Sequence, residues 1–187
     1  MASAPQAPPA LLTAEEFARR PDPGYPEELV KGRIVAMPLP GFRHGRICNK
    51  VGRILGNHAE ERDLGHVLSN DAGVITERGP DSVRGPDISF YRYERLPKEA
   101  RPEGYPEVSP DLVFEVLSPT DRWPKVLGKV VEYLDAGVAA VCVIDPEQRS
   151  LHLYEGDRAV RILGAADELT VPALLGDFRV AVGRFLD

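Results

Sequence analysis

The sequence lacks long hydrophobic runs and is poor in cysteine, and each of these features excludes a class of protein. No apolar segment approaches the about 20 residues that a membrane-spanning helix needs. The first ten residues, MASAPQAPPA, have neither a basic start nor an apolar stretch, so they do not predict a secretory signal. The two cysteines, Cys48 and Cys142, lie in apolar segments without a C-x-x-C motif. This pattern is typical of reduced packing residues in a cytoplasmic protein and suggests no zinc site.

The bulk composition is that of an ordinary globular protein. Of 187 residues, 43% are hydrophobic and 28% are charged. Residues 1–12, rich in alanine and proline, predict a flexible tail, and residues 13–187 are long enough for one domain with a real core. The net charge of −6 argues against a protein that coats nucleic acid without specificity, because such proteins are usually basic.

Positive charge is nevertheless concentrated in one segment. No acidic residue lies between Glu28 and Glu60, and that segment contains Lys31, Arg33, Arg43, Arg46, Lys50 and Arg53. The last four follow one another at steps of three, four and three, so they form one stripe on a helix predicted from Phe42 to about Arg62. We call these four residues the basic stripe. It could bind the phosphate backbone of a nucleic acid, although a solvated helix face has the same pattern.

The pattern of apolar residues predicts an α/β fold. Thr13 and Glu16 form a capping box before a short helix, and EELVKGRIVAMP has the pattern of a hairpin. Strands are predicted at 65–76, 86–93, 111–117, 139–145, 150–155 and 159–163, and a further helix at 125–136. The strand, helix and strand between residues 111 and 145 form a βαβ unit, which makes that part of the sheet parallel. We therefore predict a mixed β-sheet flanked by helices.

The strand in PDLVFEVLSP, residues 110–119, contains one residue that is costly to bury. Glu115 is the one charged residue in an otherwise apolar run from Leu112 to Leu117. An ionised carboxylate in a central strand costs several kcal/mol unless it is paired or coordinated. Two arrangements would offset this cost. One is a structural ion pair with an arginine or lysine, and the other is a metal ion in a cleft.

A second carboxylate of the same kind stands in RGPDISF. Asp87 begins an apolar strand directly after Pro86, although x-P-D is also common in turns. If the ends of the two strands lie side by side, Asp87 and Glu115 converge, and a divalent cation would offset their repulsion. Mg²⁺ suits a site with few carboxylates that keeps several waters, and Mn²⁺ could replace it.

Two more residues complete the predicted site. Glu28 lies in the first hairpin and could join the two acids, or it could simply be a charge at a strand edge. Lys129 lies on the helix after the Glu115 strand, where it could orient a water molecule. Lys125 lies one turn earlier on that helix and is the competing choice. Taken alone, each lysine is more often a solvated helix residue.

Four stretches make the chain similar to the Uma-type family of putative restriction endonucleases, formerly a domain of unknown function, in the PD-(D/E)XK nuclease superfamily. They are ELVKGRIVAMP followed by His44 and Gly45, then RGPDISF, PDLVFEVLSP and KVVEYLDAGVAAVCVIDP, and they extend over roughly residues 13 to 160. The resemblance implies a restriction-endonuclease-like fold. It also implies Mg²⁺-dependent hydrolysis of phosphodiester bonds, with DNA as the substrate.

The resemblance further implies roles for individual residues. Asp87 and Glu115 match the two acids of the motif and would hold the metal ion. Leu117 stands two residues after Glu115, where the superfamily usually has its lysine. Lys129, which opens K-x-x-x-Y, matches the family pattern and would reach the same point from the helix. Glu28 matches a further acid of the site.

Other functions stay open at this stage. His44 matches a family position, but the sequence assigns it no role. Because Leu117 replaces the usual lysine, the fold could serve as a nucleic-acid-binding module that does not cleave. A protein-interaction domain with its carboxylates in ion pairs and a metal hydrolase for small phosphoesters are further alternatives. Many nucleases of this superfamily act as dimers, since each site cuts one strand, so we predict a homodimer.

Overall fold

The computed structural model of the chain describes residues 10–187. Most of the flexible tail predicted for residues 1–12 therefore lies outside the described residues. Leu12 donates its backbone N–H to the carbonyl oxygen of Gly32 at 3.0 Å. Its side chain packs against a small core made by Ala14, Leu29 and Val83. The chain is thus held against the first hairpin from this point onward.

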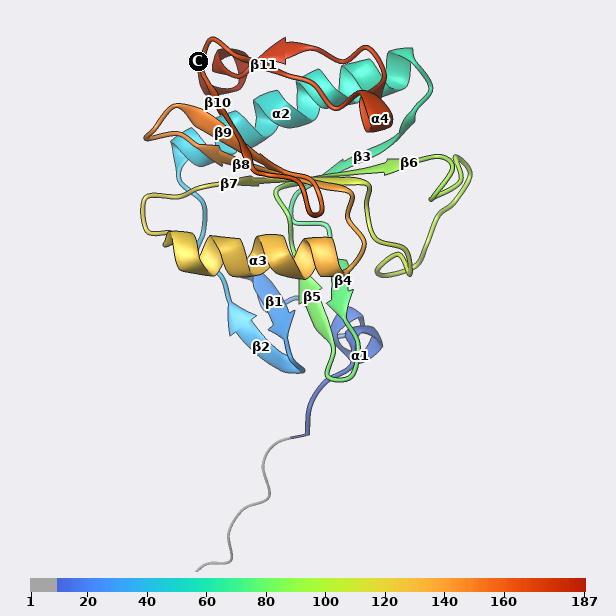
Figure 1. Ribbon diagram of the computed structural model, residues 1–187. Helices are drawn as coiled ribbons and strands as arrows, with labels where there is room; N and C mark the ends of the chain where they lie inside the picture. The colour runs from blue at the N-terminus through green and yellow to red at the C-terminus, as the bar shows by residue number, and fades with distance from the viewer. Residues whose placement is uncertain (1–9) are drawn as a thin grey trace, which may run out of the picture.

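A six-stranded mixed sheet lies at the centre of the structure (Figure 1). Its strands, in spatial order, are β10 (Arg161–Gly164), β9 (Ser150–Tyr154), β8 (Ala140–Asp145), β7 (Leu112–Val116), β6 (Ile88–Arg92) and β3 (Gly65–Ser69). β7 and β8 run parallel, as the βαβ pattern predicts. The other neighbouring pairs in this sheet are antiparallel. β7, which carries Glu115, is therefore an interior strand.

Helices cover both faces of this sheet. α2 (Phe42–Glu61) lies on one face and α3 (Trp123–Asp135) on the other (Figure 1). Phe114 and Val116 belong to the core on the α2 side, whereas Val113 packs with Tyr133 on the α3 side. Side chains alternate along a strand, so Glu115 points to the same face as Val113 and is directed towards α3.

The C-terminal part of the chain adds small elements over α2. These are β11 (Glu168–Leu169), α4 (Pro172–Leu175), β12 (Val180–Ala181) and α5 (Gly183–Leu186). Leu175, Phe178 and Phe185 join the core that Ile47 and Val51 of α2 make with the sheet. The segment that the sequence pattern leaves unassigned is therefore a cover for the outer side of α2.

A second, four-stranded sheet lies on the far side of α3 (Figure 1). Its order is β2 (Arg33–Ala36), β1 (Glu27–Val30), β5 (Ser82–Arg84) and β4 (Val74–Glu77). The predicted hairpin is β1–β2, and its turn residues Lys31 and Gly32 have φ values of 49° and 73°. Two positive φ values in succession are the geometry of a tight two-residue hairpin turn. Helix α1 (Ala14–Ala18) begins with the predicted capping box.

The strand predicted at 65–76 is wrong as one element. β3 ends at Ser69 in the central sheet, and β4 begins at Val74 in the second sheet. Asn70 and Asp71 between them have φ values of 64° and 54°. Asn and Asp tolerate this left-handed conformation better than other non-glycine residues, so this pair redirects the chain from one sheet to the other. Strand β5 lies between the predicted strands, in the turn-rich segment ERGPDSVRGP, where the sequence pattern predicts no strand.

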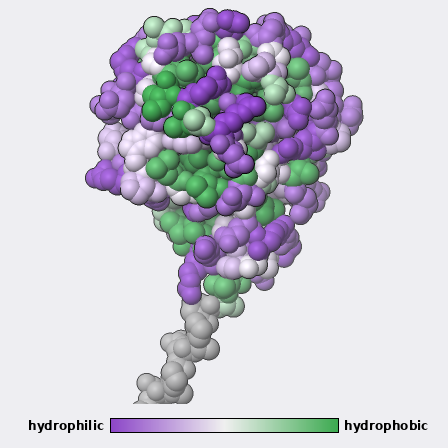
Figure 2. All heavy atoms as spheres, viewed as in Figure 1, coloured by the Kyte–Doolittle hydropathy of each residue, from purple (hydrophilic) through white to green (hydrophobic). Residues whose placement is uncertain are grey.

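The surface is mixed in character. Figure 2 shows hydrophilic side chains over much of one face, with hydrophobic patches between them. Val131 on α3 and Ile162 on β10 are among the exposed hydrophobic residues, and single residues of this kind are normal on protein surfaces. Within residues 10–187, no helix combines the length and the apolarity that crossing a membrane requires.

Candidate functional site

A cleft of about 360 Å³ brings together all four predicted catalytic residues. Glu28 reaches it from β1, Asp87 from the start of β6, Glu115 from β7 and Lys129 from α3. Loop 117–121 after β7 and segment 37–41 after β2 form its rim. Because β6 and β7 are antiparallel, the start of one strand meets the end of the other at the same edge of the sheet. This edge is where the two acids meet.

The register of β6 and β7 positions the first acid beside the second. Ile88 is paired with Phe114, so Asp87 and Glu115 are the next opposed positions at this edge. Oδ2 of Asp87 accepts the backbone N–H of Val116 at 2.7 Å. Within residues 10–187, neither carboxylate forms a salt bridge with an arginine. Asp87 and Glu115 are therefore not tied up in structural ion pairs with arginine.

Glu115 is enclosed between the sheet and α3. Only 12% of its side chain is exposed, and Oε1 accepts a hydrogen bond from the Tyr133 hydroxyl at 2.7 Å. Burial raises the pKa of Glu115 to about 7; Asp87 contributes to the increase, whereas Lys129 and Tyr133 oppose it. Burial and Glu115 also raise the pKa of Tyr133, so its hydroxyl remains a donor. Tyr133 therefore fixes the orientation of this carboxylate.

Lys129 connects the two acids that approach α3. Its Nζ lies 2.8 Å from Oε1 of Glu28 and 3.6 Å from Oε1 of Glu115. Burial favours the neutral amine, but the attraction of Glu115 and Glu28 is stronger and raises the pKa of Lys129. Lys125 also lines the cleft, but it is exposed. Of the two candidate lysines, Lys129 is therefore the one whose ammonium group lies beside Glu28 and Glu115.

Glu28 is held by two cations rather than left open to the cleft. Its Oε2 accepts a hydrogen bond from Nη1 of Arg84 at 2.8 Å, and its Oε1 faces Lys129. Arg84 is fixed on its other side by Glu132 at 2.7 Å. Burial alone would raise the pKa of Glu28, but Lys129 and Arg84 lower it below its ordinary value. Glu28 is thus an anion held equally closely by Arg84 and Lys129, each at 2.8 Å.

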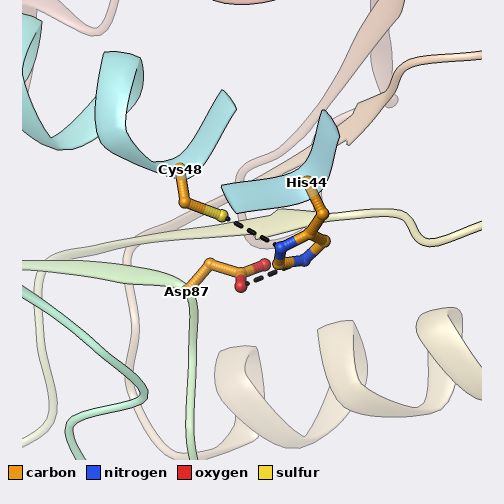
Figure 3. A group of neighbouring side chains, drawn as sticks. All are labelled: His44, Cys48 and Asp87. Atoms are coloured by element: carbon orange, nitrogen blue, oxygen red, sulfur yellow. Dashed lines mark hydrogen bonds and ion pairs between the residues drawn. The ribbon is translucent and has the colours of Figure 1, made fainter. Parts of the chain in front are cut away.

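His44 and Cys48 approach Asp87 from α2 (Figure 3). Nε2 of His44 lies 3.2 Å from Oδ1 of Asp87, and Nδ1 lies 3.4 Å from Sγ of Cys48. The hydrogen bond with Asp87 raises the pKa of His44, against the opposing effect of burial. The sequence identifies His44 only as a family position, and it suggests Cys48 as a packing residue. The structure gives both side chains a contact at the site.

Asp71 is a further acid of the cleft that sequence reasoning missed. It is exposed in the connection between β3 and β4, and it lines the cleft. Partial desolvation at the cleft raises its pKa, and repulsion from Asp87 adds to this effect. The adjacent turn-forming residues in SND could have indicated a break in the strand there. That break is what brings Asp71 near the predicted site.

The basic stripe lies outside this cleft. None of its four residues lines the cleft, although Arg43 lines a neighbouring hollow with Trp123. Arg43 is engaged with Glu147 at 2.6 Å, and Arg46 donates to the backbone carbonyl of Asp187. Arg43 is thus the member of the stripe that lies beside the cleft, and the role of the stripe in binding nucleic acid stays a prediction.

The raised pKa of Glu115 predicts a pH dependence of stability. The ordinary carboxyl pKa is 4.5, and that of Glu115 in the folded protein is about 7. Between these values the folded protein holds a proton that the unfolded chain has released, so this group stabilises the fold at low pH and less as the pH rises. We expect the free energy of unfolding of the wild type, minus that of Glu115→Gln, to decrease from pH 4.5 to 7.

Urea denaturation without divalent metal measures this difference. The groups that face Glu115 are Lys129 and Tyr133 from α3, Glu28 from β1 and Asp87 from the start of β6, so their ionisation contributes to both curves. Subtracting the Glu115→Gln curve removes most of that background. A difference that increases with pH over this range would show that the pKa of Glu115 is not raised.

Comparison with known proteins gives a family and a fold. The sequence matches the model of the Uma2 family, described as "Putative restriction endonuclease", over residues 14–183. The fold matches the crystal structure of a putative nuclease belonging to DUF820 from Anabaena variabilis with a TM-score of 0.80. The two sequences are 20% identical, and the match covers 94% of this chain and 97% of that chain. A comparison with curated proteins found no match. The predicted family resemblance and α/β fold class are confirmed.

Proposed function

The chain belongs to the Uma2 family of putative restriction endonucleases, and from this premise we propose that it is a Mg²⁺-dependent endonuclease that hydrolyses phosphodiester bonds in DNA. One observation carries the proposal. Asp87 and Glu115 lie at the same edge of adjacent strands, in a cleft that also contains Lys129. This combination supplies metal ligands and a cation at one point, although Leu117 occupies the usual lysine position.

The side chains at this point fit a divalent cation. Asp87 and Glu115 offer carboxylate oxygens, which are the ligands that Mg²⁺ prefers, and the cleft leaves room for waters. Their mutual repulsion contributes to the raised pKa of Glu115, and a cation between them would offset it. When bound there, Mg²⁺ would supply a Lewis acid for the phosphate group and favour ionisation of the attacking water. Mn²⁺ has similar ligand preferences and could replace it.

The protein's own residues orient the reacting groups. Lys129, with Nζ 3.6 Å from Glu115, is placed to hold a water molecule and to offset the negative charge that develops on the phosphate. Glu28 fixes the position of that ammonium group through its contact at 2.8 Å. Tyr133 fixes Glu115 from the other side. We propose that Glu28 and Tyr133 are positioning residues. Glu28 positions Lys129 and does not bind the metal directly. Tyr133 positions Glu115.

Cleavage assays test the proposal directly. We expect the purified protein to cleave double-stranded DNA with Mg²⁺ or Mn²⁺ and to lose this activity when EDTA is added. RNA and single-stranded DNA of the same sequence identify the substrate class, and a small phosphodiester identifies general phosphoesterase activity. DNA binding without cleavage under all these conditions would favour the non-cleaving binding module. We also propose that the protein forms a homodimer, in which each site cuts one strand.

The basic stripe predicts the salt dependence of DNA binding. Replacing Arg46 and Lys50 with glutamine removes two charges that could neutralise backbone phosphates. We expect the slope of log K against log salt concentration to become smaller by about 2, because each phosphate contact contributes about 0.9. Binding is measured with EDTA present, so that cleavage does not interfere.

A double variant elsewhere on the surface controls for net charge. Arg101→Gln with Arg158→Gln also removes two positive charges, but these lie in the loop between β6 and β7 and in the turn after β9. We expect this variant to retain nearly the wild-type slope. Equal slopes for both double variants would exclude a specific role of the stripe.

A further inference from the structure

A second set of metal-binding atoms lies on the α2 side of Asp87. One ring nitrogen of His44, the sulfur of Cys48 and one carboxylate oxygen of Asp87 all lie within 4.8 Å of one another (Figure 3). His44 and Cys48 are four residues apart on α2, so both project from the same side of the helix. Asp87 faces them from the start of β6. The three side chains are thus presented by two packed elements rather than by a loose surface loop.

The chemistry of this set differs from that of the proposed Mg²⁺ site. Thiolate and imidazole are ligands of Zn²⁺ and related transition-metal ions, whereas Mg²⁺ requires oxygen ligands. The Sγ–Nδ1 distance of 3.4 Å is close to the about 3.6 Å that separates sulfur and nitrogen around tetrahedral Zn²⁺, given bonds of about 2.3 and 2.1 Å. Asp71, which also lines the cleft, adds a further carboxyl group nearby. Small side-chain movements would complete a three-ligand site with water in the fourth position.

We propose that Zn²⁺, or another transition-metal ion of its class, binds His44, Cys48 and Asp87 and thereby inhibits the nuclease. The inhibitory effect rests on the proposed function, because it requires Asp87 to serve the Mg²⁺ site. Binding forms a bond between the metal and Cys48 sulfur, and the thiol proton passes to solvent. The imidazole binds in its neutral form. No electron is transferred, so no oxidant or reductant is needed.

Asp87 is the shared residue that makes the two metals compete. Its Oδ2 accepts the N–H of Val116 at 2.7 Å, which fixes the orientation of the carboxylate and turns Oδ1 towards His44. Oδ1 lies 3.2 Å from Nε2 of His44, whereas Nδ1 is the ring nitrogen beside Cys48. An ion held by His44 and Cys48 draws this oxygen towards α2 and away from Glu115. The positive charge of that ion also repels Mg²⁺ from the neighbouring position.

Cobalt binding tests the ligand set without reference to activity. Co²⁺ occupies zinc sites, and a thiolate ligand gives it a strong charge-transfer band in the near ultraviolet. We expect this band for the wild-type protein, and we expect addition of Zn²⁺ to abolish it. Cys48→Ser should remove the band, whereas Cys142→Ala should keep it, because Cys142 is buried in β8 away from this cluster. Absence of the band in the wild type, or its persistence in Cys48→Ser, would overturn the proposal.

Inhibition is tested in the cleavage assay with Mg²⁺ in excess. We expect Zn²⁺ to lower the wild-type rate by at least about tenfold, and a chelator selective for Zn²⁺ to restore it. Each variant is compared with its own rate without Zn²⁺, and Cys48→Ser should resist inhibition. A cobalt band together with an unchanged cleavage rate would overturn inhibition. Cleavage without any cobalt band would leave the proposed nuclease standing and overturn the zinc site alone.

Discussion

Single replacement of Asp87 by asparagine or of Glu115 by glutamine is expected to reduce Mg²⁺-dependent DNA cleavage by about 10³-fold, a magnitude typical of losing one preorganised charge-stabilising group. Each amide keeps the size of the acid and one oxygen acceptor. The N–H of Val116 and the hydroxyl of Tyr133 can therefore still donate to it. What disappears is the negative charge, which a divalent cation requires. The loss should consequently appear in metal affinity and in the cleavage rate together.

The same replacements should leave the fold intact. Glu115 is largely enclosed, and its surroundings disfavour the charged form, so a neutral amide removes an unfavourable term as well as a favourable contact with Lys129. Far-ultraviolet circular dichroism and thermal melting check this point. Metal affinity is measured by calorimetry, and cleavage is measured with saturating DNA over a range of Mg²⁺ concentrations.

An acid on the rim of the cleft provides the control. Asp121 lines the cleft, is exposed, and accepts the N–H of Ser118 at 2.7 Å, which an asparagine oxygen can also do. We expect Asp121→Asn to cleave at close to the wild-type rate. Folded Asp87→Asn and Glu115→Gln proteins that retain wild-type cleavage would remove both acids from the mechanism. Equal loss in all three variants would indicate a general effect of charge in the cleft.

The central strand could be recognised from sequence because its pattern depends on near neighbours. The apolar run around Glu115 predicts a strand buried on both faces, and β7 is that strand. The helix and strand that follow it predict the parallel pairing with β8, which the structure shows. The cost of burying one carboxylate then indicates a special environment for Glu115. This reasoning needs only residues that are close in the chain.

The partners of that carboxylate could not be derived in the same way. The sequence names Asp87, but the register that sets it opposite Glu115 depends on how β6 pairs with β7 across a long loop. Tyr133 has the spacing of an ordinary core residue, and its hydroxyl contact follows only from the packing of α3. Asp71 lies within residues 65–76, which the sequence pattern predicts as one continuous strand. Each of these contacts is made across the tertiary structure.

The basic stripe shows the limit of helical periodicity. Its spacing places Arg43, Arg46, Lys50 and Arg53 on one side of α2, and the helix is present from Phe42 to Glu61. The spacing of these residues does not predict which part of the protein that side of the helix faces. His44 and Cys48, on another side of the same helix, meet Asp87, while Arg46 meets the C-terminal residue Asp187. The direction of a helical face is set by the core that the helix packs on.

Replacing Lys129 by methionine is expected to reduce cleavage by about 10²- to 10³-fold, while Lys125→Met changes it by less than about threefold. Methionine retains much of the length of the side chain but removes the ammonium group near Glu28 and Glu115. Without that charge, the pKa of Glu115 should rise further, so the remaining activity should require higher pH than the wild type. Glu28 keeps its contact with Arg84, which preserves its local packing.

The pH profile separates this role from a purely structural one. A variant that is merely less stable loses activity in parallel at every pH at which it stays folded, whereas loss of the Lys129 charge shifts the rising limb of the profile. Lys129→Arg restores the charge in a different shape and should recover the wild-type position of that limb, with only part of the rate. Lys125 is exposed on the same helix, so Lys125→Met controls for the loss of one positive charge at the cleft. If Lys125→Met proved the more damaging change, the nearer lysine in space would not be the functional one, and Lys129 would serve only to neutralise Glu28.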